Sequence, residues 1–257
     1  MKLFYRTFGE GQPLIILHGL FGISDNWVTF GKRIAKLGYK VFIPDQRNHG
    51  QSPHSDTFNY LAMTDDLMDF IDEHEIEDPI LIGHSMGGKV SIRFALENPE
   101  LIKKAVIVDI SLREYPKRTS HLQIIDAMRR IDFDMVRSRK EVDMLISERL
   151  PDYKLRNFIL KNLYWEEKNK LAWRINFEAI CDNIDDLFDG VDTMDTFDNP
   201  CLFIRGSLSD YVLDQDIPRI EYNFPSYKLT TIENASHWVH AEAPEEFYYL
   251  VSEFLED

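Results

Sequence analysis

Five short, unbroken runs of apolar residues recur along the chain, and each is typical of a buried strand. Runs without alternating polar residues suit parallel strands, whose two faces are both covered. The five runs are Leu14–Leu17, Val41–Ile43, Ile80–Ile82, Ala105–Val108 and Cys201–Ile204. We expect an antiparallel edge strand over Lys2–Phe8, because the glycine-bearing turn at residues 9–11 folds the chain back directly after it.

Helical stretches fill much of the space between these runs. We expect helices over Asn26–Leu37, Leu61–Ile71, Met86–Leu96 and Pro244–Leu255. Strands that alternate with helices indicate a mostly parallel sheet with helices on both faces. The sequence therefore predicts an α/β fold, and 257 residues suffice for one such domain with an insertion.

The alternation of strands and helices stops between about Leu112 and Val191. No strand-like run is visible there, and the segment is helical in character and rich in aromatic residues. We interpret residues 112–191 as a helical cap that lies over the carboxyl ends of the strands. Residues 1–111 and 192–257 then form the core domain.

A serine flanked by glycines follows the third apolar run. Residues 83–88 read Gly-His-Ser-Met-Gly-Gly, between a predicted strand and a predicted helix. Gly-x-Ser-x-Gly in this context marks the sharp turn that lifts a nucleophilic serine above the edge of a sheet. The turn leaves no room for a Cβ atom at its glycines, and it directs the N–H of Met86 at a developing oxyanion. We therefore predict Ser85 as a nucleophile.

The same residues match most of a phosphate-binding loop. Gly83 to Lys89 fits Gly-x-x-x-x-Gly-Lys, but Val90 replaces the Ser or Thr that must follow to hold magnesium. We therefore rank a nucleotide-binding loop below the serine turn.

His237 is the predicted base among the eight histidines. It follows a strand-like run at Lys228–Ile232 and precedes the final helix, in the order nucleophile, acid, histidine that such hydrolases use. His240 forms an i, i+3 pair with it, yet the sequence offers no third metal ligand, so we expect a surface or packing role. His18 and His49, beside glycines in loops, are interpreted as structural.

Two aspartates compete for the role of the acid that orients His237. Asp109 directly follows the run Ala105–Val108 and so lies at the carboxyl end of a strand. Asp210 follows a later strand, but one position after the place where many hydrolases of this type carry their acid, which here is Ser209. Because a shift of one residue changes where a carboxylate points, we favour Asp109 and keep Asp210 as the alternative.

The loop after the first run is the predicted source of the second oxyanion donor, although a plain glycine-bearing loop is the alternative interpretation. Residues 18–22 read His-Gly-Leu-Phe-Gly, and the N–H of Leu20 is the predicted donor, with that of Phe21 as the alternative. Phe21 and Trp238, beside this loop and the predicted base, are the predicted substrate-binding residues.

The overall charge narrows the classes of partner. A formal net charge of −15 disfavours binding to nucleic acids and to anionic membrane surfaces.

The two cysteines, Cys181 and Cys201, are expected to be reduced thiols. The first residues resemble no signal peptide, and no apolar run near them could span a bilayer, so we predict a cytoplasmic protein without membrane insertion.

One segment runs against the overall charge. Eight basic and four acidic side chains lie between Arg113 and Lys140. A basic rim beside the pocket would suit an anionic leaving group such as coenzyme A, whereas a solvated helix face is the more ordinary interpretation.

Taken together, these motifs resemble the α/β-hydrolase superfamily over nearly the whole chain. More closely, the chain resembles small esterases of the YbfF type and their mitochondrial abhydrolase-domain relatives. The matching stretches are residues 18–22 with Asn26-Trp27, 45–52, 83–89, 108–111 and 237–242. In that family the acid follows the strand that carries Val-Asp-Ile, which supports Asp109. The family tends to carry Ser-Pro-Tyr where this chain has Ser209-Asp210-Tyr211, which keeps Asp210 open.

The resemblance implies hydrolysis of short acyl esters or acyl-CoA thioesters, without a cofactor. Dehalogenases and epoxide hydrolases of this fold need an aspartate in place of Ser85. Cofactor-free perhydrolases and carbon–carbon bond hydrolases keep the serine and remain alternatives. A non-catalytic receptor for a small ligand is the alternative from another class, because a fold does not fix a function.

Overall fold

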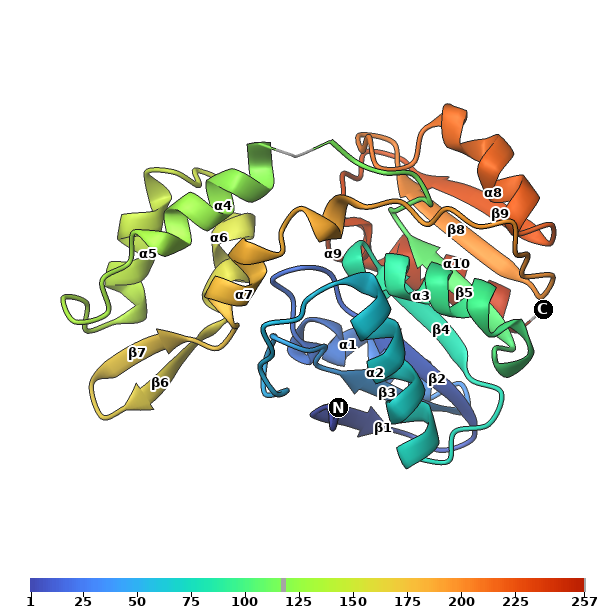
Figure 1. Ribbon diagram of the computed structural model, residues 1–257, viewed down its shortest axis with the longest axis horizontal. Coiled ribbons are helices and arrows are strands. Elements are labelled where there is room, and N and C mark those ends of the chain that lie inside the picture. Colours follow the sequence, from blue (N-terminus) through green and yellow to red (C-terminus); the bar gives the residue numbers. More distant parts are fainter. Residues whose placement is uncertain (117–118, 257) are drawn as a thin grey trace.

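A seven-stranded sheet forms the centre of the computed structural model, which describes residues 1–116 and 119–256 (Figure 1). The strands lie in the order β1-β3-β2-β4-β5-β8-β9. All neighbours run parallel except β1 and β3, which are antiparallel. The strands are β1 (Tyr5–Phe8), β2 (Gln12–Leu17), β3 (Tyr39–Pro44), β4 (Ile80–His84), β5 (Lys104–Val108), β8 (Cys201–Gly206) and β9 (Tyr227–Ile232). The predicted α/β-hydrolase fold, its five buried strands and its antiparallel edge are confirmed.

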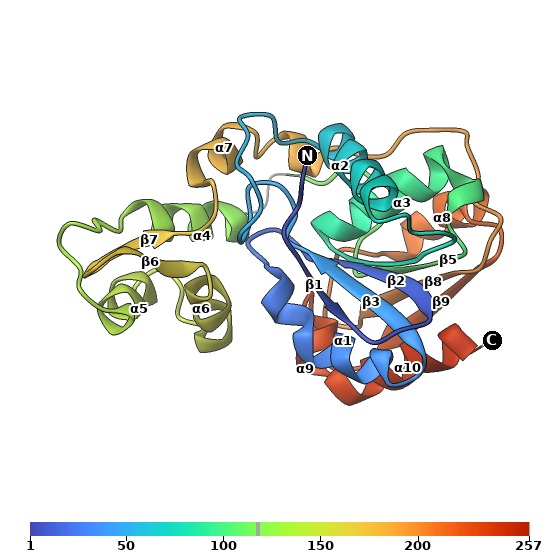
Figure 2. The same cartoon turned by 90° about the horizontal axis from the view of Figure 1, so that it is seen from below.

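Helices cover both faces of this sheet (Figure 2). One face carries α1 (Val28–Ala35), α9 (Val239–Glu242) and α10 (Pro244–Glu256), and the other carries α2 (Tyr60–Glu73), α3 (Met86–Glu97) and α8 (Ile217–Asn223). Successive residues of β2 point to opposite faces, so Leu14 and Ile16 join the first apolar layer and Ile15 and Leu17 the second. The four predicted helices are present. The first begins at Val28, after a short 3-10 turn at Ser24–Trp27.

The chain leaves the core after β5 and forms a separate lobe before it returns at β8 (Figure 1). The lobe contains α4 (Thr119–Arg129), α5 (Arg139–Ser147), α6 (Tyr153–Leu160), α7 (Phe177–Asp182) and the hairpin of β6 (Leu163–Glu167) and β7 (Lys170–Trp173). Further 3-10 turns span Pro99–Leu101, Asp186–Phe188 and Asp214–Asp216.

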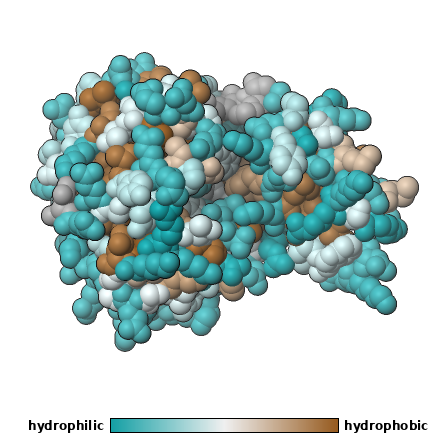
Figure 3. Space-filling view, turned by 180° about the vertical axis from the view of Figure 1, so that it is seen from behind, coloured by the Kyte–Doolittle hydropathy of each residue, from teal (hydrophilic) through white to brown (hydrophobic). Residues whose placement is uncertain are grey.

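Hydrophilic side chains cover most of the face of the molecule that Figure 3 shows.

The hairpin corrects the expectation that this lobe has no strand. Leu163 pairs with Trp173 across it, so the helical character expected of this segment stops at Leu160, where α6 ends. The strands are short, and several charged side chains interrupt them, so they form no apolar run. The turn places Asn169 at φ 66, a conformation that asparagine tolerates better than most residues.

The two crossings between the core and the lobe lie side by side. Val191 N–H donates to Leu112 O at 2.8 Å, and Tyr115 N–H donates to Phe188 O at 2.8 Å. We keep residues 112–191 as the proposed cap, because these bonds close the segment at both ends. Within the described residues, the helices are too short or too polar to cross a membrane.

A buried lysine joins these crossings to α3. The Nζ of Lys89 donates to Leu112 O at 3.1 Å, to Arg113 O at 2.6 Å and to Asp189 O at 2.8 Å. Burial lowers the pKa of Lys89 to about 7. Since this ammonium group is held by three carbonyl groups of the chain, it does not present itself to a phosphate, which argues against the phosphate-binding loop.

Candidate active site

Ser85 occupies the sharp turn between β4 and α3. Its backbone has φ 52 and ψ −117, and its N–H donates to Val108 O at 3.0 Å. A Cβ atom on Gly83 would overlap the Gly87 carbonyl oxygen, and one on Gly87 would overlap that of Leu17. Both glycines are therefore required for the strand, the turn and the helix to approach so closely.

Three predicted residues form one chain of hydrogen bonds. His237 Nε2 lies 2.9 Å from Ser85 Oγ, and His237 Nδ1 lies 2.8 Å from Asp109 Oδ2. Asp109 is fully buried, and its Oδ1 accepts the N–H of Gly206 at 3.0 Å. Because a carboxylate only accepts, Nδ1 carries the imidazole hydrogen and Nε2 is left to accept the serine proton.

Asp210 lies apart from this chain of contacts. Its side chain is exposed, and its carbonyl oxygen accepts from the Arg113 guanidinium at 2.7 Å. The structure thus brings Asp109, and not Asp210, to His237. Asp109 has φ 50, and this unusual backbone lets its side chain turn toward the imidazole.

Two backbone N–H groups remain beside Ser85 for an oxyanion. Met86 begins α3, so its N–H has no partner within the helix. The loop approaches Ser85 closely, since a Cβ atom on Gly19 would lie 3.2 Å from Ser85 Cβ. Phe21 N–H donates to His49 Nε2 at 3.1 Å, whereas the N–H of Leu20 has no bonded partner among the described residues. This difference favours Leu20 as the second donor.

The histidines of the neighbouring loops hold backbone groups. His18 Nε2 accepts the N–H of Gln46 at 3.0 Å, and His49 accepts that of Phe21. Burial lowers the pKa of His18 to about 4 and that of His49 to about 3, so both are neutral acceptors at neutral pH. His240 stacks on Trp27 with ring centroids 4.2 Å apart, which fits the expected packing role.

The two predicted substrate-binding residues differ in position. Trp238 lines a cavity of about 460 Å³ between α6 and α9, and its ring lies 4.3 Å from that of Phe158. The side chain of Phe21 is 2% exposed and belongs to the core, and its carbonyl oxygen accepts from Asn162 of the lobe at 2.8 Å. The structure therefore gives Phe21 a packing role, and its contact with substrate stays a prediction.

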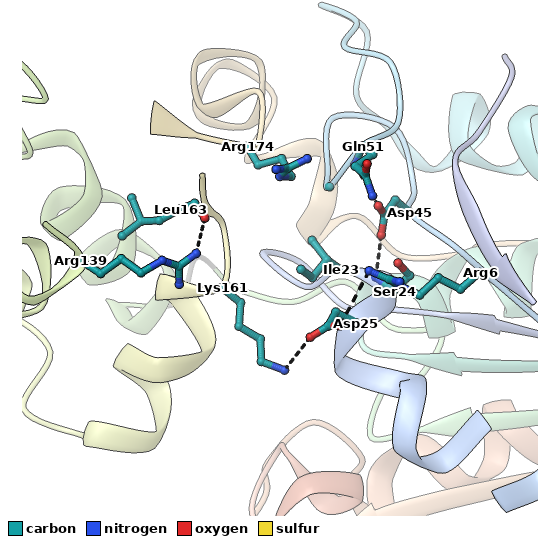
Figure 4. Close-up of a pocket in the computed structure, with 11 residues that line it drawn as sticks. Arg6, Ile23, Ser24, Asp25, Asp45, Gln51, Arg139, Lys161, Leu163 and Arg174 are labelled. Carbon is teal, nitrogen blue, oxygen red and sulfur yellow. Dashed lines mark hydrogen bonds and ion pairs between the residues drawn. The ribbon is translucent and has the colours of Figure 1, made fainter. Parts of the chain in front are cut away.

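A second cavity, of about 360 Å³, lies between the core and the lobe (Figure 4). Four cationic side chains line it, together with two carboxylates, which are those of Arg6, Arg139, Lys161, Arg174, Asp25 and Asp45. Asp45 accepts the backbone N–H groups of Ser24 and Gln51, and Asp25 lies 3.3 Å from the Lys161 ammonium. The Arg174 guanidinium lies over the Tyr164 ring and has no carboxylate partner among the described residues.

The basic run between Arg113 and Lys140 contributes little to this cavity. Among the described residues of this run, Arg139 alone lines it, while Arg113 pairs with Asp216 and Arg130 with Asp126. Lys117 and Arg118 lie outside the described residues. The structure therefore gives the basic rim little support over the preferred interpretation of a solvated helix face, and three of the four cations of the second cavity come from outside this run.

Three residues outside the predicted set contact the triad. The hydroxyl of Ser209 bonds to Asp109, the ring of Tyr211 stacks on His237, and the ring of His84 lies 4.8 Å from that of His237. Ser209 and Tyr211 belong to the segment that matches Ser-Pro-Tyr of the resembling family, but the sequence does not show that a loop about a hundred residues after Asp109 reaches the site.

Comparisons with known proteins agree with this geometry. A family model described as alpha/beta hydrolase fold matches residues 12–143. The sn-1-specific diacylglycerol lipase ABHD11 of Xenopus laevis is 37% identical over 251 residues, which are 96% of this chain and 80% of that protein. Esterase YbfF of Escherichia coli is 31% identical over 248 residues, 96% of this chain and 94% of that protein. The solved structure of a marine microorganism esterase superposes with a TM-score of 0.95 at 40% identity, covering 98% of this chain and 99% of that one. The chain therefore belongs to the alpha/beta hydrolase family, among its esterase- and lipase-type members.

Proposed function

We propose that the protein hydrolyses carboxylic esters through an acyl-enzyme on Ser85. The observation that carries this proposal is the continuous chain from Ser85 through His237 to the buried Asp109, with both contacts under 3 Å. A serine hydroxyl is activated when it contacts a base that a third group holds in the right orientation.

The proposed reaction proceeds in two acyl transfers. His237 takes the Ser85 proton as the hydroxyl oxygen attacks the carbonyl carbon, and it then gives that proton to the leaving alcohol. Water repeats the sequence on the acyl-enzyme, which releases the acid and restores Ser85. Asp109 holds the imidazole and stabilises the imidazolium without taking the proton. The N–H groups of Leu20 and Met86 would bind the oxyanion, and each such donor typically contributes about 2.7–4 kcal/mol.

The test begins with covalent labelling. A fluorophosphonate should label the wild-type protein and should fail to label Ser85→Ala. Hydrolysis of p-nitrophenyl esters of increasing chain length should be lost in Ser85→Ala and strongly reduced in Asp109→Asn. Asp210→Asn is the matched control and should keep activity. Labelling that survives in Ser85→Ala would refute the mechanism, and loss in Asp210→Asn alone would move the acid to that residue.

A thioester with an anionic leaving group, such as acyl-CoA, is a second candidate substrate. The cavity of Figure 4 supports it, because its lining carries four cationic side chains against two carboxylates in an otherwise acidic protein. Ile23 and Ser24, which follow the oxyanion loop, form part of its wall. An anion bound there would lie on the same side of the protein as the loop that carries Leu20.

Kinetics on two substrates with the same acyl group separate these candidates. Arg174→Gln and Lys161→Gln should each raise KM for the acyl-CoA roughly threefold to tenfold. Neither variant should change KM for the p-nitrophenyl ester. Lys168→Gln, an exposed lysine of the β6–β7 turn, is the control. Equal effects on both substrates would exclude a leaving-group site in this cavity.

The remaining alternatives predict different products. A perhydrolase would require peroxide, and a carbon–carbon bond hydrolase would release no alcohol or thiol. A receptor would bind an ester without turnover, but the relatives named as esterases and lipases support an enzyme. An acylglycerol belongs among the substrates tested, because the Xenopus laevis relative is named a diacylglycerol lipase.

A further inference from the structure

A buried side chain of the lobe bonds to the oxyanion loop, residues 18–22. The Nδ2 of Asn162 donates to Phe21 O at 2.8 Å, and Asn162 is fully buried. Phe21 directly follows Leu20, whose N–H is the proposed second oxyanion donor. We infer that Asn162 is a positioning residue through which the lobe fixes the oxyanion loop in the conformation that catalysis needs. This inference rests on the proposed function.

The oxyanion loop has a backbone conformation that needs support. Gly22 N–H donates to Gly19 O at 2.9 Å and closes a four-residue turn, with Phe21 at its third position. Phe21 has φ 60, and a turn with a positive φ at this position usually carries glycine or asparagine there. A bulky residue in this conformation is strained, so its surroundings must hold it. If the Phe21 backbone relaxed, the peptide that joins it to Leu20 would rotate and the Leu20 N–H would move with it.

Both polar groups of the Phe21 backbone are held. Its N–H donates to His49 Nε2 at 3.1 Å, and its carbonyl oxygen accepts from Asn162. His49 belongs to the core, but the residue before it is also tied to the lobe, because Asn176 N–H donates to Asn48 O at 2.9 Å. Asn48 has φ 65. The two core loops that meet through Phe21 and His49 are therefore each bonded to the lobe at a residue with a positive φ.

The orientation of the Asn162 amide follows from its neighbours. Its Nδ2 faces the carbonyl oxygen of Phe21 and that of Ile159, which lies at 3.2 Å. Because a carbonyl oxygen only accepts, the nitrogen of the amide, and not Oδ1, lies at these two oxygens. Asn162 N–H donates to Ile159 O at 3.0 Å, and Arg174 N–H donates to Asn162 O at 2.7 Å. Asn162 thus presents a firmly held donor to the oxyanion loop from just beyond the end of α6.

The first test removes this donor and compares catalysis with binding. Asn162→Leu has a similar size and no donor, and Asn162→Ala is a smaller second variant that cannot clash. Each should lower kcat on a p-nitrophenyl ester roughly tenfold or more and change KM less than about threefold, because a displaced oxyanion donor affects the transition state. The affinity for an aryl trifluoromethyl ketone, which forms a tetrahedral adduct with Ser85, should fall by a similar factor.

The second test exchanges oxygen for sulfur in the substrate. In a thionoester the atom that gains negative charge is sulfur, which accepts hydrogen bonds weakly. The wild-type protein should therefore prefer the oxygen ester, and the two Asn162 variants should lose much of that preference. A variant that has merely lost part of its fold would hydrolyse both substrates more slowly by the same factor, and thermal unfolding would identify it.

Asn183→Ala is the matched control. The Nδ2 of Asn183 donates to Asp56 O at 2.9 Å, so this amide also ties the lobe to a carbonyl group of the core, but not to the oxyanion loop. The control should keep the wild-type kcat and the wild-type preference for the oxygen ester. If Asn183→Ala loses as much of both as Asn162→Ala, a general loosening of the lobe explains the two variants and the inference fails.

The outcomes separate this inference from the proposed function. If Ser85→Ala is inactive while both Asn162 variants keep the wild-type kcat, ketone affinity and substrate preference, Asn162 has no positioning role and the proposed function stands. If Ser85→Ala keeps activity, the proposed function fails and the inference fails with it. If the Asn162 variants raise KM and leave kcat and the substrate preference unchanged, Asn162 acts on substrate binding and the inference is overturned.

Discussion

Replacing His240 with phenylalanine should make the protein more resistant to acid. Burial lowers the pKa of His240 to about 3, compared with 6.5 for a free histidine. Burial likewise lowers the pKa of His49 to about 3 and that of His18 to about 4. Below pH 6.5 the unfolded chain binds protons that the folded protein excludes, so the free energy of unfolding falls as the pH drops from about 6.5 toward 4.

The magnitude follows from these pKa values. At about pH 5 a histidine that is protonated only when unfolded removes about 2 kcal/mol of stability relative to pH 7. The three histidines together remove about 6 kcal/mol, which approaches the whole stability of many domains. His240→Phe should keep the stacking on Trp27 and remove the buried Nδ1, for which the described part of the chain offers no hydrogen-bond partner. It should therefore cost little at neutral pH.

Urea unfolding at several pH values between about 5 and 8 measures this effect. The wild-type protein should lose stability steeply, and His240→Phe should lose about 2 kcal/mol less between pH 7 and pH 5. If the free energy of unfolding depends on pH in the same way for both proteins, His240 takes up its proton in the folded state as well. The reasoning from burial would then be wrong.

Three further changes probe the turn, the crossings and the cavity. Gly87→Ala places a methyl group against the Leu17 carbonyl oxygen and should destabilise the protein in urea by about 2 kcal/mol or more and prevent fluorophosphonate labelling; normal labelling would contradict this. Lys89→Met removes the donor shared by Leu112, Arg113 and Asp189 and should speed proteolytic cleavage at residues 112–116, whereas unchanged cleavage would show that the backbone bonds suffice. Phe158→Ala enlarges the cavity beside Trp238 and should change kcat/KM for long acyl esters more than for acetate; an equal change for all chain lengths would place the acyl group elsewhere.

The strands were predictable from the sequence for a physical reason. Parallel strands covered on both faces need unbroken apolar runs, and every residue of β4 is buried. The β6–β7 hairpin could not be predicted from apolar runs, because its residues 166–168 and 170 are exposed and charged. Its pairing depends on a tight turn and on packing of Leu163 and Leu171, and not on a run of hydrophobic residues.

The candidate site was predictable to a different degree at each residue. Ser85 stands in a motif whose glycines are sterically required, so the sequence indicates it directly. The choice between Asp109 and Asp210 depends on the direction of a carboxylate, which is set by φ at Asp109 and by the loop after β8. The inward position of Phe21 likewise depends on its φ of 60, in a turn closed by the bond from Gly22 N–H to Gly19 O.

The paired crossings between β5 and β8 have a consequence for how this enzyme can change over evolutionary time. Because Leu112 and Val191 meet through one backbone hydrogen bond, the lobe begins and ends at nearly the same point in space. Insertions, deletions or a wholesale exchange of the intervening residues would leave the register of the seven-stranded sheet intact. Remodelling of this one segment would therefore change the proposed contacts with substrate, while Ser85, Asp109 and His237 all lie outside it.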